Sequence, residues 1–88
     1  MSHAEFVDVV AARARGGYEL ELSWADGATT VVDVEPYLYG EVFEPLRDPA
    51  VFATVQVDPD AGTVCWPITG ADISPEELRR VGRPVGRR

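Results

Sequence analysis

The stretch from Phe43 to Leu78 constrains the fold of this chain more than any other part of its sequence. It contains two places where a helix can begin, and between them two short runs of β-branched residues separated by a tight turn. The order along this stretch is therefore helix, strand, turn, strand, helix. Such an order predicts a small α+β domain.

The first helix is expected just after Asp48-Pro49. An Asp side chain before a helix can accept a hydrogen bond from one of the free backbone N–H groups of the first turn. Pro suits the first helical position, because the N–H that it lacks has no partner there in any case. We expect this helix to be short, from about residue 49 to residue 54.

The second helix is expected after Ser74, where Ser74-Pro75-Glu76-Glu77 has the spacing of a capping box. In that motif the Ser and the Glu three residues later each bond a backbone N–H of the first turn. The helix should end near Val81, because Gly82 and Pro84 follow it and both are typical of a helix end.

A β-hairpin is predicted between the two helices, with arms at 55–57 and 63–66. The turn between them, Asp-Pro-Asp-Ala-Gly at 58–62, is also similar to the start of a calcium loop. However, it lacks an oxygen ligand before the Gly, and Thr69 stands where the last ligand should be a Glu. We therefore interpret it as a β-turn with Gly in the left-handed region.

The first 34 residues predict a three-stranded antiparallel meander. Apolar and polar side chains alternate from Tyr18 to Trp24, which is typical of a strand with one buried face. Gly16-Gly17 and Asp26-Gly27 are hairpin turn pairs on either side of it. The outer strands are expected within residues 6–15 and 29–34.

Together these elements predict an α+β fold with a small antiparallel sheet, composed of the meander and the second hairpin, and two short helices. An 88-residue chain has no room for a second hydrophobic core. We expect a single domain over residues 1–81 and an Arg-rich, flexible tail over residues 82–88.

The charges are unevenly distributed along the chain. Its net charge is -7, from fifteen acidic and eight basic residues, all of them Arg. Five of the eight are in or near the tail: Arg79, Arg80, Arg83, Arg87 and Arg88. This asymmetry either marks an interaction arm or is a solvated acidic surface with a frayed C-terminus, and the second interpretation is favoured.

Several short motifs follow one another in a fixed order: FEPLRDP at 43–49, GTVCWP at 62–67, GADI at 70–73 and SPEEL at 74–78. On these motifs the chain resembles an uncharacterised family of short bacterial proteins, domain of unknown function 2442. The resemblance implies a small α+β domain. Relatives tend to carry an Asn after the Trp-Pro step, where this chain has Ile68-Thr69, so a role of that amide would be altered here.

The resemblance also implies two kinds of associated protein. Some relatives are fused to a repressor-like helix-turn-helix domain, and others are neighbours of a second small protein in toxin–antitoxin pairs. This chain continues for only a short distance beyond Leu78, so we expect no operator recognition through a helix-turn-helix.

The residues provide little material for catalysis or for metal binding. The only His is His3, near the N-terminus, and the only Cys is Cys65, in an expected strand. No Cys/His spacing suits zinc, and no glycine-rich phosphate loop is present. We therefore expect no enzymatic activity, no cofactor and no metal. A lone Cys suggests the reducing cytoplasm, and no segment resembles a membrane span or a signal peptide.

A few residues remain as candidates for an interaction surface. Tyr37, Tyr39 and Phe43 would form a contact patch if they were exposed together. Arg47, Trp66 and Asp72 have the least complete folding explanation. For each of these a structural role is the competing interpretation: an ion pair for Arg47, the core for Trp66 and a local turn for Asp72.

The favoured function is a protein-binding module, antitoxin-like or regulatory, whose partner is small, basic and encoded nearby. The alternative is weak nucleic-acid association through the Arg-rich tail. A homodimer, formed by pairing of edge strands, is also left open.

Overall fold

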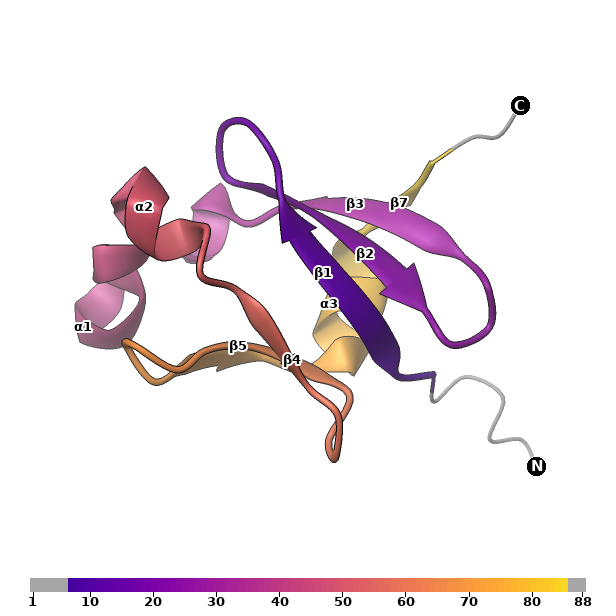
Figure 1. Ribbon diagram of the computed structural model, residues 1–88. Coiled ribbons are helices and arrows are strands. Elements are labelled where there is room, and N and C mark those ends of the chain that lie inside the picture. Colours follow the sequence, from indigo (N-terminus) through magenta and orange to yellow (C-terminus); the bar gives the residue numbers. More distant parts are fainter. Residues whose placement is uncertain (1–6, 86–88) are drawn as a thin grey trace.

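Two antiparallel sheets and several short helices make up the described part of the chain, residues 7–85 of a computed structural model (Figure 1). The first sheet has the strand order β1-β2-β3-β7, and the second has the order β4-β5-β6. The strands are β1 (Val9–Ala14), β2 (Glu19–Trp24), β3 (Thr29–Asp33), β4 (Gln56–Asp58), β5 (Thr63–Trp66), β6 (Ala71–Ile73) and β7 (Arg83–Pro84). The helices are η2 (Glu35–Tyr37), α1 (Gly40–Phe43), η3 (Glu44–Arg47), α2 (Pro49–Phe52) and α3 (Pro75–Val81). The predicted α+β class is confirmed.

The predicted meander is confirmed as β1, β2 and β3. In β2 the side chains of Leu20, Leu22 and Trp24 are buried, as their alternation with polar residues indicated. Val32 and Thr30 pair with Leu20 and Leu22 and are buried on the same face. This face of the first sheet is therefore the one that packs into the core.

One irregularity interrupts β1. Val9 pairs with Trp24 and Ala11 pairs with Ser23, so Val10 is an extra residue that forms a β-bulge. The side chain of Val10 is 58% exposed. An apolar residue therefore lies on the surface at this point of the sheet.

The predicted hairpin is confirmed as β4 and β5, and Gly62 has the predicted left-handed conformation, but the turn is closed by a five-residue hydrogen bond instead of the four-residue bond of a β-turn. Gly62 has φ +66, and its N–H donates to the carbonyl of Asp58 at 2.8 Å. The turn also rests on β1, because the N–H of Val9 donates to the carbonyl of Gly62 at 3.3 Å. A Cβ at Gly62 would lie 2.4 Å from the side chain of Asp8, so this position requires glycine.

The second sheet contains a strand that the sequence did not reveal. β6 pairs with β5 through Val64–Ile73, Cys65–Asp72 and Trp66–Ala71. Ala71 and Ile73 are buried while Asp72 is exposed. Three residues are too short a run for alternation to be recognised, and the pairing with β5 creates the strand.

Both predicted helix starts are confirmed. Asp48 accepts from the N–H of Ala50 at 2.9 Å, and Ser74 accepts from the N–H of Glu77 at 3.2 Å. The Glu77 carboxylate accepts instead from the side chains of Tyr37 and Arg80. Only Ser74 caps α3. The Glu77 side chain, the other member of the predicted capping box, instead connects α3 to Tyr37 of η2.

The residues between β3 and α2 form a chain of short helices. η2 is followed by α1 and η3. Each is a single turn, too short to show a helical repeat in its hydrophobic pattern. Leu38 and Leu46 are fully buried and fix this segment to the core.

Residues 83–85, which the sequence assigned to a flexible tail, lie along β3. Thr30 pairs with Pro84 and Val31 pairs with Arg83, and the N–H of Val85 donates to the carbonyl of Thr29 at 3.0 Å. Arg87, Arg88 and His3 lie outside the described residues.

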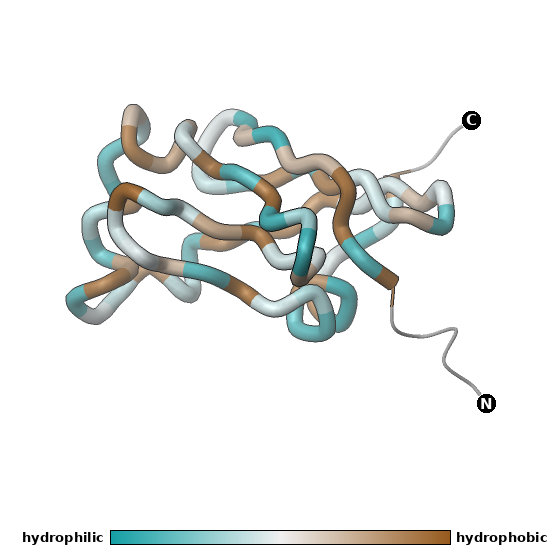
Figure 2. Tube along the Cα trace, turned by 60° about the horizontal axis from the view of Figure 1, so that its bottom comes forward, coloured by the Kyte–Doolittle hydropathy of each residue, from teal (hydrophilic) through white to brown (hydrophobic). Residues whose placement is uncertain are grey.

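One hydrophobic cluster joins the two sheets and α3, with Trp66, Phe52 and Leu78 among its buried members. In Figure 2, hydrophobic and hydrophilic residues alternate over short distances along the chain. Among the described residues, no helix is long and apolar enough to cross a membrane.

Candidate interaction surface

Arg47 ties the short helices together. Its Nε donates to the carbonyl of Leu38 at 2.8 Å, and its own carbonyl accepts from the hydroxyl of Tyr18 in the β1–β2 turn. These two bonds connect η3 to the end of η2 and to the β1–β2 hairpin. Arg47 therefore has a structural role, of a different kind from the ion pair that the sequence suggested.

Tyr37 is half-buried and joins η2 to α3. Its hydroxyl donates to Oε2 of Glu77 at 2.6 Å. This hydrogen bond, together with burial, raises the pKa of Tyr37 above its ordinary value of 10.0. The pKa of Glu77 is lowered below 4.5 by its hydrogen bonds from Arg80 and Tyr37. The Tyr37 hydroxyl is therefore already used in a hydrogen bond within the molecule.

Of the three aromatic residues proposed as a contact patch, only Tyr39 is exposed. Its side chain is 72% exposed, whereas Phe43 packs against the core. Val42, which the sequence analysis did not single out, is 45% exposed. Sequence reasoning missed Val42 because an apolar residue beside Phe43 gives no local sign of which of the two is buried.

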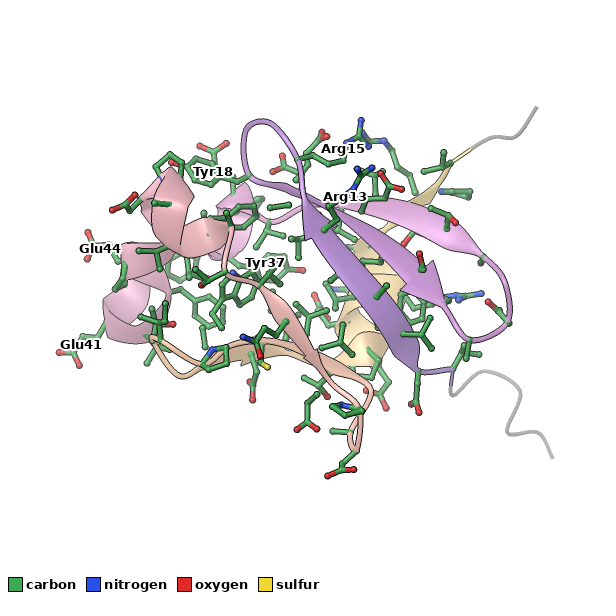
Figure 3. All side chains as sticks on the ribbon, viewed as in Figure 1. Arg13, Arg15, Tyr18, Tyr37, Glu41 and Glu44 are labelled. Carbon is green, nitrogen blue, oxygen red and sulfur yellow. The ribbon has the colours of Figure 1, made fainter. Side chains whose placement is uncertain are left out.

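Two carboxylates accompany these apolar side chains. Glu41 and Glu44 are exposed, and Figure 3 shows both pointing away from the body of the molecule at the α1 end. We refer to the side chains of Tyr39, Glu41, Val42 and Glu44 as the α1 surface.

Trp66 is a core residue and is removed from the candidates. It is fully buried, and its Nε1 donates to the carbonyl of Phe52 at 2.9 Å. Its ring stacks on that of Phe52, with centroids 5.8 Å apart, and Tyr18 meets Phe52 edge-on at 5.5 Å. The core explains why a Trp stands at this position.

Asp72 is exposed on the outer face of the second sheet, in register with Cys65. Partial burial, followed by the charges of Asp58 and Asp72, raises the pKa of the Cys65 thiol above 9.0. A reactive cysteine requires the opposite shift, because the thiolate is the nucleophile. The surroundings of Cys65 therefore favour the protonated thiol over the nucleophilic thiolate.

The described arginines of the tail region are held by carboxylates of the same molecule. Arg79 donates to Asp26 at 2.9 Å, and its Cζ lies 4.8 Å from the centroid of the Trp24 ring. The hydrogen bond from Arg79 lowers the pKa of Asp26. The remaining ion pairs in residues 7–85 are Arg80–Glu77, Arg83–Glu19 at 3.4 Å and Arg13–Glu21 at 2.8 Å.

These ion pairs leave the negative charge concentrated in one part of the chain. Residues 33–72 contain eight carboxylates and one arginine, Arg47, which bonds the Leu38 carbonyl. We refer to the eight as the acidic flank: Asp33, Glu35, Glu41, Glu44, Asp48, Asp58, Asp60 and Asp72. In Figure 3, Arg13 and Arg15 lie near the top of the first sheet, apart from Glu41 and Glu44 at the α1 end.

Two shallow hollows lie elsewhere on the surface. One, of about 330 Å³, lies between the β1–β2 turn and α2, and Tyr18 and Phe52 line it. The other, of about 230 Å³, lies beside the β-bulge and is lined by Val10 and Val57. Within the part of the chain that the structure describes, no three His, Cys, Asp or Glu side chains gather closely enough to hold a metal ion.

The comparison with protein families finds a match that covers most of the described chain. The family model described as "Protein of unknown function (DUF2442)" matches residues 9–84, which run from the start of β1 to the end of β7. The chain belongs to the DUF2442 family. No curated protein and no solved structure matches this DUF2442 chain.

The Ile68-Thr69 step of the DUF2442 chain forms the turn between β5 and β6. The N–H groups of Thr69 and Gly70 donate to the carbonyl of Trp66, and the Thr69 hydroxyl accepts from the N–H of Ala71 at 3.2 Å. Short polar side chains commonly make such local turn bonds. Ile68 is 69% exposed.

Proposed function

We propose that this chain is a cytoplasmic protein-binding module whose acidic flank binds a small basic protein. The observation that supports it best is the distribution of the ion pairs. In residues 7–85, the four ion pairs use Glu19, Glu21, Asp26 and Glu77, and none of these belongs to the acidic flank. Among the residues that the structure describes, the carboxylates of the flank thus form no ion pair.

An excess of carboxylates without ion pairs favours a basic partner on physical grounds. Clustered charge of one sign accelerates encounter with a molecule of the opposite sign and disfavours partners of like charge. The free thiol of Cys65 suits a reducing compartment. The resemblance noted in the sequence analysis extends the proposal to an antitoxin-like or regulatory role, with a partner encoded nearby.

Nucleic-acid association through the tail is the weaker hypothesis. Arg79, Arg80 and Arg83 each bond a carboxylate of the same molecule. A phosphate would have to displace these carboxylates and approach a molecule with a net charge of -7. Both requirements oppose binding.

The proposal is tested by affinity purification of the tagged chain from its native host at low salt, with mass spectrometry of the companions. We expect a basic protein that is released as salt is raised, because screening weakens contacts between opposite charges. A variant with Asp72→Asn, Glu41→Gln and Glu44→Gln should retain less of it. A companion that is unaffected by both salt and the substitutions would contradict the proposal, as would the absence of any companion.

A further inference from the structure

We infer that the α1 surface is the docking site for a basic segment that carries an apolar side chain beside its Lys or Arg residues. This inference rests on the proposed function, and it specifies which part of the molecule engages the partner and by what chemistry.

The first support is that the segment carrying α1 is anchored to the rest of the molecule at both of its ends. Leu38 and Leu46 are fully buried on either side of it. Arg47 bonds the carbonyl of Leu38, and Tyr18 bonds the carbonyl of Arg47. An interaction surface whose backbone is already fixed loses less conformational entropy on binding, so its contacts contribute more to affinity.

The second support is the kind of side chain exposed there. Tyr39 is the most exposed large hydrophobic residue of the described chain at 72%. Val42, three residues further along the chain, is 45% exposed. Burial in the core does not explain either of them. Tyr is enriched among the residues that dominate binding energy, because a large, rigid ring contributes much contact area.

The third support is charge complementarity. Glu41 and Glu44 flank Val42 on the same short segment, and both belong to the acidic flank. A purely apolar partner would leave these carboxylates without compensation, and an acidic partner would be repelled. A partner segment with an apolar side chain between cationic ones could contact the exposed apolar side chains and pair with the two carboxylates.

The test uses two synthetic peptides of equal positive charge, one of alternating Lys and Leu blocks with an amphipathic pattern and one with Ser in place of Leu. Each is titrated into the full-length, isotope-labelled chain, and backbone amide shifts are recorded by NMR. We expect the Lys/Leu peptide to bind more tightly, with the largest shifts at residues 39–44. Tyr39→Ser with Val42→Ser should weaken its affinity about tenfold, as for a central anchor.

One control variant and one charge variant keep the inference falsifiable. Val10→Ser removes an exposed apolar side chain at the β-bulge and should leave the affinity unchanged. Glu41→Gln with Glu44→Gln should weaken binding at low salt. Circular dichroism verifies that each variant is folded, which is expected because all the substituted side chains are exposed.

Three results would overturn the inference. Equal affinity for the two peptides would show that the apolar anchors contribute nothing. Shifts centred on Asp58 and Asp60 would move the site to the β4–β5 turn, while the proposed acidic-flank function would survive. If neither peptide bound saturably at low salt, the inference would fail, while the proposed function would still be decided by the companions purified from the host.

Discussion

Gly62 occupies a position that no other residue can fill without moving the start of β1. Replacing it by Ala would combine a positive φ with a close approach to Asp8, because the new Cβ would lie 2.4 Å from that side chain. We expect Gly62→Ala to lower the free energy of unfolding by about 2–4 kcal/mol, from backbone strain and overpacking together. Urea denaturation monitored by tryptophan fluorescence measures the change.

Gly17→Ala is the matched control for this substitution. Gly17 has nearly the same φ, +68, but no heavy atom of another segment lies within 4 Å of the place that an Ala Cβ would take. It should cost only the conformational strain, about 1 kcal/mol. Equal losses in the two variants would show that the packing of the turn on Asp8 contributes nothing.

For single residues, the sequence predicted the role of a side chain where that role depended only on residues nearby in the chain. Asp48 and Ser74 were predicted as caps because a cap bonds a backbone N–H only two or three residues away. Trp66 and Tyr39 could not be told apart in the same way. Whether an aromatic ring is buried depends on which distant element covers it, and for Trp66 that element includes Phe52.

Among the elements, η2 and α3 are joined by one hydrogen bond whose strength depends on pH. The raised pKa of Tyr37 means that its contribution to stability is present below pH 10.0 and is lost as pH rises through the folded-state value. The lowered pKa of Glu77 means that its contribution is present above pH 4.5 and is lost as pH falls through the folded-state value. Tyr37→Phe should therefore destabilise the fold at neutral pH.

Urea denaturation of the wild type and of Tyr37→Phe across the pH range tests this link. The difference should be about 1 kcal/mol near neutrality and should shrink in acid, well below pH 4.5, and in strong base. Tyr39→Phe, at the 72% exposed neighbour, is the control and should show little difference at any pH. A Tyr37→Phe effect that is constant with pH would mean that the bond to Glu77 is not its cause.

The elements that the sequence predicted are those with a local pattern. β2 shows alternation over six residues, and the β4–β5 hairpin has a turn that ends with glycine. β6, with three residues, and β7, with two, exist because β5 and β3 offer hydrogen-bonding edges to them. Such strands are properties of the assembled sheet and cannot be recognised one segment at a time.

For the whole molecule, salt should increase stability rather than decrease it. The net charge of -7 causes repulsion within the folded chain, and salt screens it. Salt also weakens the ion pairs, which lowers stability. This loss is small, because the ion pairs are at the surface and such pairs typically contribute about 0–1 kcal/mol. We expect the urea midpoint to rise with sodium chloride, and to rise less in a Glu41→Gln/Asp72→Asn variant. A fall with salt would show that the ion pairs dominate.

The pairing of β7 with β3 also has a mechanical consequence. β1 and β7 are the two edges of the first sheet, so tension applied through residues 7 and 85 would cross that sheet from one edge to the other. While β7 stays paired, the hydrogen-bonded path from β1 through β2 and β3 to β7 bypasses the backbone of residues 34–82, which include the second sheet and the α1 surface. The pairing of Arg83 and Pro84 with β3 would therefore have to open before the backbone of that segment carried the full tension.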